Sequence, residues 1–302
     1  MRKLSVAILF LLSLGVFAQS DYTLAHQYFS RINQNPAATG SNDYFNIFYM
    51  HRQQWVGWDG APVTNVLNAH TYLEKISSGI GLTFDYDQIG VSSQSVNAKL
   101  AYAYYLKLGR DKLLSLGVAG GILYKSLDGN RLVLPGGDPA GIYLPNESSV
   151  KPDVDLGGEF TSRWLLIGVA ANHILNQKDD VSSVVAPMAF RAYARGNIGL
   201  GQSFDIAPTF SYAHLNYNDI FEASLTAFYK KMIWLGGGYR LNANAVFGMI
   251  GLEYSIFRIG YSYEYMTAKN YPAPNTHEFL LSLRIPKSSK YSGNQRAVRF
   301  ME

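Results

Sequence analysis

The 302-residue chain contains no cysteine. Without a thiol it forms no disulfide framework, no thiolate metal site and no cysteine nucleophile. Only 16% of its residues are charged and 14% are aromatic, whereas about a quarter of the residues of a typical soluble protein are charged. After residue 17, no apolar run reaches the roughly 20 residues that a membrane-spanning helix requires. If the mature chain enters a membrane, it therefore does so as strands.

The N-terminus has the pattern of a secretory signal peptide. Two basic residues precede an apolar run over residues 4–17, and Ala18 offers a small residue at the cleavage point. An anchor helix is the alternative, but the run is too short to span a bilayer. We expect residues 1–18 to be removed, leaving Gln19 near the start of the mature chain. Losing two positive charges lowers the formal net charge from +4 to +2, so the basic balance says little about partners.

From about residue 44 to residue 285, the sequence alternates with the two-residue period of β-strands. In the last such segment, apolar and polar side chains take opposite faces: Phe279, Leu281, Leu283 and Ile285 against Glu278, Ser282 and Arg284. The polar faces are rich in Gly, Ser, Ala and Thr instead of the Lys and Glu of a soluble sheet. This pattern predicts strands that turn apolar side chains to lipid and polar side chains to a lumen.

Gly, Asn and Asp residues divide this region into about fourteen predicted strands, most of them about ten residues long, as a tilted membrane-crossing strand requires. The predicted strands are 44–54, 63–73, 78–87, 93–107, 112–126, 153–161, 163–172, 188–200, 203–215, 220–230, 231–240, 245–255, 256–266 and 276–285. The predicted fold class is all-β, an antiparallel up-and-down transmembrane β-barrel of the outer-membrane type. Short turns of such barrels face the periplasm, and an even strand number predicts that both termini do so too.

A mixed set of charged residues is predicted to face the lumen: Asp85, Asp87, Lys99, Asp155, Glu159, Arg191, Arg195, Glu222, Glu253, Arg258, Glu264, Glu278 and Arg284. We expect mutual salt bridges, because the alternative, a selectivity filter, favours one sign of charge. The longest predicted loop, 127–152, is rich in Asp and Gly. Its spacing does not match a calcium-binding loop, so an ordinary surface loop is the favoured interpretation over a calcium site.

The sequence gives no sign of catalytic or cofactor chemistry. No two of the six histidines have metal-ligand spacing along the chain. There is no Gly-x-Ser-x-Gly elbow, and the glycines at 236–238 lack the Lys-Ser/Thr of a phosphate loop. Lysine and arginine are scattered, which does not support nucleic-acid binding. We expect no enzyme activity, no cofactor and no metal, although a metal site assembled across strands is an open alternative.

Two stretches go beyond a generic barrel pattern. They are Asn35-Pro36-Ala37-Ala38-Thr39-Gly40 and Arg52-Gln53-Gln54-Trp55-Val56-Gly57-Trp58-Asp59-Gly60-Ala61-Pro62. With the closing segment 277–284, they resemble the PorP/SprF family of Bacteroidetes outer-membrane proteins, and the resemblance covers essentially the whole mature chain. It implies an outer-membrane component of the type IX secretion system that delivers or retains particular secreted proteins, such as gliding adhesins. A passive or substrate-selective channel for small solutes is the alternative.

The resemblance also implies partners: outer-membrane lipid, a secreted protein with the type IX C-terminal sorting domain, and periplasmic type IX components. Rigid aromatic residues near a membrane face are good anchors for protein contact. The alternative role for Trp55 and Trp58 is in an aromatic girdle at the membrane surface. The candidate partner-binding residues are Asn35, Pro36, Gly40, Arg52, Gln54, Trp55, Gly57, Trp58, Gly60 and Pro62.

The expected organisation of the chain has four parts. A signal peptide covers 1–18, and the barrel covers 44–285. Between them, 19–43 is Asn-rich and too polar to span a membrane, so it either plugs the lumen or forms a loose periplasmic leader. Residues 286–302 form a periplasmic tail.

Overall fold

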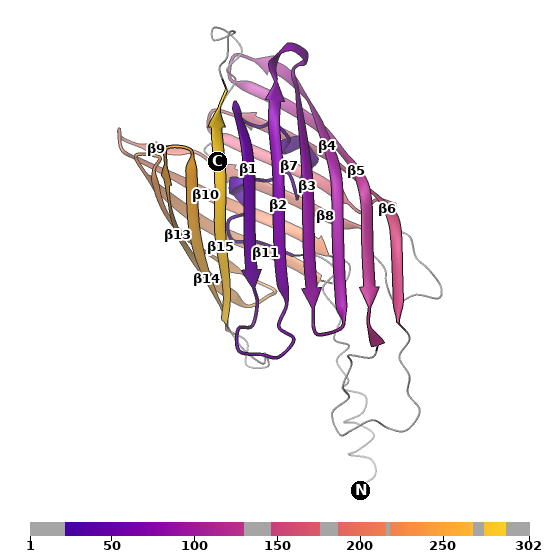
Figure 1. Cartoon of the computed structure of the whole chain (residues 1–302). Helices are drawn as coiled ribbons and strands as arrows, with labels where there is room; N and C mark the ends of the chain where they lie inside the picture. Colours follow the sequence, from indigo (N-terminus) through magenta and orange to yellow (C-terminus); the bar gives the residue numbers. More distant parts are fainter. Residues whose placement is uncertain (1–21, 130–145, 176–186, 216–217, 268–274, 288–302) are drawn as a thin grey trace, which may run out of the picture.

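The chain folds into a closed antiparallel β-barrel (Figure 1). This computed structural model describes residues 22–129, 146–175, 187–215, 218–267 and 275–287. The strands are β1 (Tyr44–Gln53), β2 (Val63–Leu73), β3 (Ser78–Ile89), β4 (Ser93–Gly109), β5 (Lys112–Leu127), β6 (Glu147–Ser162), β7 (Leu165–Asn172), β8 (Ala189–Gly196), β9 (Ile198–Leu200), β10 (Phe204–Leu215), β11 (Asn218–Tyr229), β12 (Ile233–Arg240), β13 (Ala245–Tyr254), β14 (Phe257–Met266) and β15 (Asn275–Pro286). Pairing of β1 with β15 and of β10 with β11 closes the ring.

Fourteen strand positions make up the wall, because β8 and β9 both pair with β10 and share one position. The predicted fold class is confirmed. Three 3₁₀ turns accompany the strands: η1 (Gln27–Phe29), η2 (Pro36–Ala38) and η3 (Glu74–Ile76). No helix in the described part of the chain is long and apolar enough to cross a membrane.

Two predicted boundaries are wrong. The predicted strand 188–200 breaks at Asn197, and β6 starts at Glu147, so the predicted loop 127–152 is shorter than expected. The predicted strand starts after Pro152, because proline cannot donate a ladder hydrogen bond and is disfavoured inside a strand. At Pro152, β6 pairs with β5 alone, since its pairing with β7 starts at Leu156, and a proline is tolerated at such an edge.

Some expectations lie outside the described residues. They are the signal peptide 1–18, residues 130–145 of the loop with the calcium alternative, and residues 288–302 of the tail.

The two faces of the wall carry different side chains, as the alternation predicts. On β15, Leu281 is 46% exposed on the outside, whereas its neighbour Ser282 is 3% exposed on the inside. The predicted apolar faces that contain Ile80, Ile259 and Phe279 all point outward, each with about half of its side chain exposed. The apolar outer surface therefore faces lipid, and the polar groups line the lumen.

The connections distinguish the two ends of the barrel. The end that carries the connections 54–62, 128–146, 173–188 and 267–274 is called the long-loop end here. The other end, called the short-turn end, has the tight connections 110–111, 163–164 and 255–256. Strand β1 runs from the short-turn end to the long-loop end, and β15 runs the opposite way (Figure 1). The described C-terminal residues therefore reach the short-turn end.

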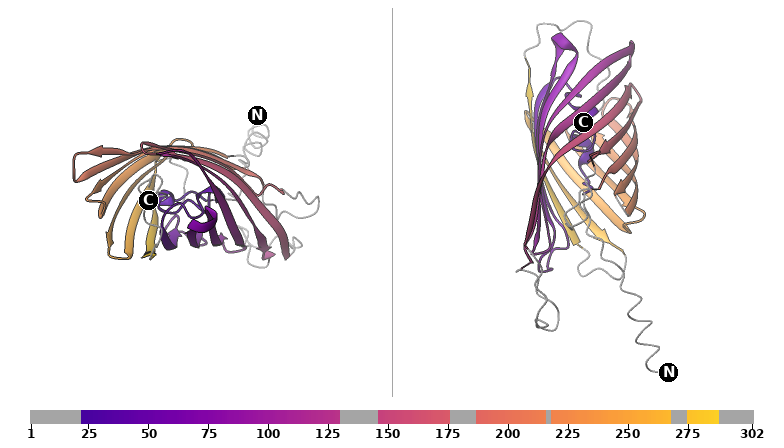
Figure 2. Two further views of the ribbon diagram at one scale, coloured as in Figure 1. Left: turned by 90° about the horizontal axis from the view of Figure 1, so that it is seen from above. Right: turned by 90° about the vertical axis from the view of Figure 1, so that its right-hand side faces the viewer.

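Residues 22–43, called the plug, lie inside the ring of strands (Figure 2). Every residue from Leu24 to Gly40 is buried except Asn33. Apolar plug residues form a core cluster with inward side chains of the wall: Leu24 and Phe29 with Phe48, Met50, Val66, Ala207, Phe228, Trp234 and Leu280. The hydrophobic core of this barrel thus sits in its lumen, and the plug provides one side of it.

Candidate functional site: the plug and the long-loop end

The Asn35–Gly40 motif attaches the plug to glycines of the wall. The Asn35 side chain accepts a hydrogen bond from the Ala37 backbone N–H at 2.9 Å, which caps the η2 turn. It also donates to the Gly158 carbonyl at 3.2 Å and to the Tyr193 hydroxyl at 3.1 Å. Gly117 of β5 lies so close that a Cβ there would overlap the backbone of Ala37. The motif therefore requires a wall without side chains at this point.

At the short-turn end, Gly40 closes the plug against β2 and β3. Its φ of +76° is in the left-handed region, which glycine adopts without steric cost. Its backbone N–H donates to His70 Nδ1 at 3.0 Å. A Cβ at Gly40 would come within 2.7 Å of the Gly79 Cα, so both glycines are needed for this approach.

A buried ion pair clamps the middle of the plug. Arg31 donates to Glu159 of β6 through Nε at 2.9 Å and Nη2 at 3.0 Å, a bidentate pair. The Tyr193 hydroxyl of β8 donates to the same carboxylate at 2.5 Å. The Arg31 and Glu159 side chains are at most 2% exposed, so loss of either leaves a buried charge without its counter-ion.

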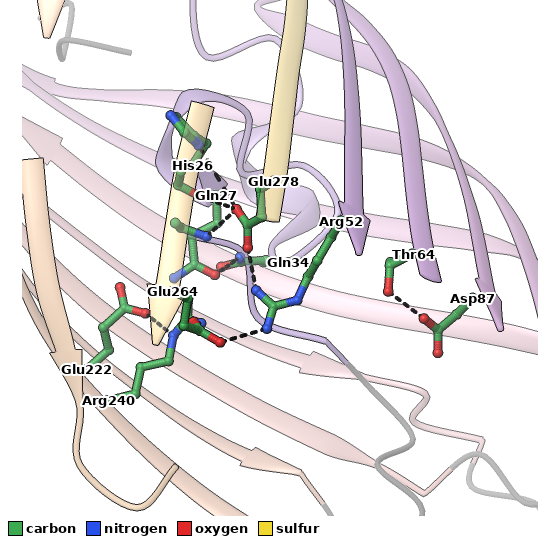
Figure 3. A network of polar contacts seen from close by, with 12 residues as sticks. His26, Gln27, Gln34, Arg52, Thr64, Asp87, Glu222, Arg240, Glu264 and Glu278 are labelled. Carbon is green, nitrogen blue, oxygen red and sulfur yellow. Dashed lines mark hydrogen bonds and ion pairs between the residues drawn. The ribbon is translucent and has the colours of Figure 1, made fainter. Parts of the chain in front are cut away.

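A chain of alternating charges crosses the seam where β15 meets β1 (Figure 3). Arg52 of β1 donates to Glu264 at 2.9 Å and forms an ion pair with Glu278. Arg240 forms an ion pair with Glu264 and donates to Glu222 at 2.9 Å. All five side chains are buried, and the network links β11, β12, β14, β15 and β1. The predicted salt bridging of lumen charges is confirmed here.

The plug joins this network at its N-terminal part. The Ala25 backbone N–H donates to Glu278 at 2.9 Å, and His26 Nδ1 lies 4.0 Å from the same carboxylate. Neither ring nitrogen of His26 has a hydrogen-bond partner among the described residues. Burial, opposed by Glu278 and assisted by the positive charge of Arg258, lowers the pKa of His26 to about 4. His26 is therefore neutral at physiological pH.

A second polar cluster joins three strands on the other side of the lumen. Lys99 of β4 reaches across Gly121 of β5, and its Nζ lies 2.7 Å from oxygens of both Asp153 and Asp155 of β6. His173 Nδ1 is 2.7 Å from Asp153. The two aspartates and His173 are close enough to hold a metal ion across strands. The Lys99 ammonium already forms ion pairs with both carboxylates and offsets part of their charge.

A small cavity adjoins this cluster at the N-terminal end of the plug. Its volume is about 50 Å³, and Tyr22, Asp85, Asp87 and Lys99 are among the residues that line it. The Tyr22 hydroxyl donates to Asp85 at 2.5 Å, and the Asn33 amide donates to the same oxygen at 2.6 Å. A cavity of this size has room for a few water molecules.

The 54–62 loop stands at the long-loop end and is held at several points. Trp55 has φ +51°, and its indole N–H donates to the Met266 sulfur at 2.9 Å. Backbone N–H groups of Gln54 and Val56 donate to the carbonyls of Pro62 and Asn275. Trp58 is 52% exposed. The loop therefore presents one large aromatic side chain on a backbone fixed by hydrogen bonds.

The structure divides the predicted partner-binding residues into two groups. Asn35, Pro36, Gly40 and Arg52 are buried in the lumen, where they hold the plug and the seam. The wall surrounds these four residues, and a role for them in partner binding stays a prediction. The other six belong to the loop: Gln54, Trp55, Gly57, Trp58, Gly60 and Pro62.

Sequence reasoning missed the residues that meet across the lumen. Arg31, Asp153 and Arg240 were not among the predicted inward charges, although each forms a buried ion pair. A signal was present on the inward face of β1, where Phe48 and Met50 lie between Asn46 and Arg52. Large apolar side chains on that face indicate that something apolar fills the lumen.

A family model described as type IX secretion system membrane protein PorP/SprF matches residues 16–283. The chain belongs to this family. The PorP/SprF model covers both motifs and nearly the whole wall, so this chain is a secretion-related barrel, integral to the outer membrane.

Solved structures show the same fold at low sequence identity. The chain is similar to the toluene transporter TbuX of Ralstonia pickettii, with a TM-score of 0.55 and 9% identity over 84% of this chain and 93% of that one. It is also similar to the toluene transporter TodX of P. putida, with a TM-score of 0.52 and 11% identity over 84% and 93% of the two chains. At such low sequence identity, the likeness shows the fold alone. No curated protein matches the chain.

Proposed function

We propose that this PorP/SprF barrel is a non-enzymatic anchor or accessory for the surface delivery of specific secreted proteins. The clients are proteins with a type IX C-terminal sorting domain, such as gliding adhesins, and they dock at the long-loop end. Periplasmic type IX components are the expected partners at the short-turn end. The observation that carries the proposal is the plug, because it is buried in the lumen against inward side chains of the wall and occupies the space that a passage would need.

The 54–62 loop supports a docking role. Gly57 and Gly60 adopt φ values of +99° and +78°, which few other residues tolerate. With Trp55 fixed to Met266, little conformational entropy remains to be lost when a partner binds. Trp58 projects from this fixed backbone, and tryptophan is among the residues that dominate binding energy at protein interfaces.

Replacement of Trp58 by alanine tests the docking role. Loss of an interface hot spot of about 2 kcal/mol predicts roughly 30-fold weaker binding of the purified client to the barrel in detergent. The matched control is Trp164→Ala, because Trp164 is 61% exposed and lies in the 163–164 turn at the opposite end. Equal affinity of Trp58→Ala and the unchanged protein, or an equal loss with Trp164→Ala, contradicts the proposal.

A substrate-selective channel for small solutes is the second candidate. It is supported by the likeness to structures described as toluene transporters and by the small polar cavity beside Tyr22. The buried plug weighs against it. Liposome swelling with the full-length protein separates the two functions, because solute entry without removal of the plug favours the channel.

A further inference from the structure

We infer that the plug threads the barrel so that the mature N-terminus opens at the long-loop end, opposite to the C-terminus. The plug is then a strap, covalently fixed to β1 at the short-turn end and held by noncovalent contacts at the other. This arrangement differs from the expectation that both termini lie on the periplasmic side.

The contacts at the two ends of the plug give its direction. Gly40 lies against Thr71 and Gly79, which are close to the 74–77 turn at the short-turn end. At the other end of the plug, Tyr22 bonds to Asp85, and Asp85 pairs with Val66 of β2 and Asn97 of β4, near the long-loop ends of those strands.

Arg191 confirms the direction from the other side of the ring. Its Nη2 donates to the Tyr22 carbonyl at 3.3 Å. Arg191 is the third residue of β8, which starts at the long-loop end after the 173–188 connection. The backbone of Tyr22 itself, and not only its side chain, therefore lies in the long-loop half of the lumen.

The remaining chain is too short to turn back. If cleavage precedes Gln19, three residues precede Tyr22, and they reach at most about 11 Å when extended. Asp85 lies seven residues along β3 from Ser78, the residue at the short-turn end. At about 3.3 Å per residue, that distance is about 23 Å along the strand. Three extended residues are therefore too short to bring the mature N-terminus back to the short-turn end.

The holding contacts differ along the strap. Its middle and short-turn parts are held by the Arg31–Glu159 pair, by the apolar cluster and by close approach to wall glycines. At the long-loop end, Tyr22 is only partly buried, and the small cavity lies beside it. A partner that docks beside the 54–62 loop meets the strap at its less buried end, so release proceeds from that end.

An epitope tag inserted between Ser20 and Asp21 tests the direction of the strap. Controls carry the same tag at Asp59 in the 54–62 loop and after Glu302, and heat-modifiable migration on semi-native gels verifies that each barrel is folded. Antibody staining of intact cells is expected for the Ser20 and Asp59 tags, whereas the Glu302 tag is expected only after permeabilisation of the outer membrane.

A single-cysteine variant provides an independent reading if the tag disturbs folding. The chain has no cysteine, so Ser20→Cys gives one site for a membrane-impermeant maleimide. Labelling that parallels Asp59→Cys in intact cells supports the inference. Labelling of Ser20→Cys only after permeabilisation of the outer membrane, as expected for Lys75→Cys at the short-turn end, overturns it. No labelling of the folded protein, in intact or in permeabilised cells, overturns it as well.

Discussion

At the scale of single residues, the lumen is determined by where side chains are absent as much as by where they are present. Gly117 of β5 gives the plug backbone room to lie directly on the wall. Gly120, three residues further along the same strand, has no atom within contact distance of an added Cβ, because it faces outward. The two glycines have the same chemistry and opposite roles, which sequence alone does not distinguish.

This pair gives a matched test of plug docking. Gly117→Ala is expected to destabilise the folded barrel by about 1–3 kcal/mol, the usual cost of overpacking, because the added methyl group overlaps Ala37. Gly120→Ala is expected to change stability by less than about 0.5 kcal/mol. Urea unfolding in detergent measures both. Equal stability of the two variants contradicts the close docking of the Asn35–Gly40 motif.

At the scale of elements, strands were predictable because alternation records which side of the wall each residue faces. Most predicted strand ends agree with the structure to within two or three residues, as for β1, β2 and β13. The sequence does not decide between a plug and a loose leader for residues 19–43, because this segment has no period and is polar. Its partners, such as Glu159 for Arg31, lie more than 100 residues away in sequence. Only the register of the closed barrel brings them together.

The stability of the docked plug is expected to depend on pH because of His26. The pKa of His26 falls from 6.5 to about 4 on docking, so the released plug binds the proton more readily. The contribution of neutral His26 to the stability of the docked state is therefore fully present above pH 6.5 and decreases as the pH falls toward 4. At one pKa unit per 1.36 kcal/mol, the loss at pH 5 is about 2 kcal/mol relative to pH 7.5.

Urea unfolding at pH 7.5 and pH 5 checks this value, with His26→Phe as the matched variant. A phenylalanine fits the apolar contacts with Phe29 and Trp234 and carries no titratable group. The variant is expected to lose about 2 kcal/mol of the difference between the two pH values, and the difference that remains belongs to other groups of the chain. An undiminished pH dependence in the variant contradicts the role of His26.

At the scale of the whole molecule, composition and alternation together predicted a lipid-facing barrel, and its family follows from two short motifs. The structure adds the reason why these motifs lie where they do. The first motif docks the plug, and the second contributes Arg52 to the seam and Trp58 to the long-loop end. The proposed partner surface is the 54–62 loop, because the other four candidate residues are buried in the lumen. No pattern along the sequence shows this difference in burial.

If the plugged barrel serves as a platform, its ion conductance distinguishes it from a channel. Planar-bilayer recording of the purified full-length protein is the most direct test, with a variant that lacks residues 22–40 as the control. We expect no steady conductance from the full-length protein, because the plug fills the lumen, and large open events from the variant. A stable, solute-sized conductance from the full-length protein would contradict the platform and favour a channel.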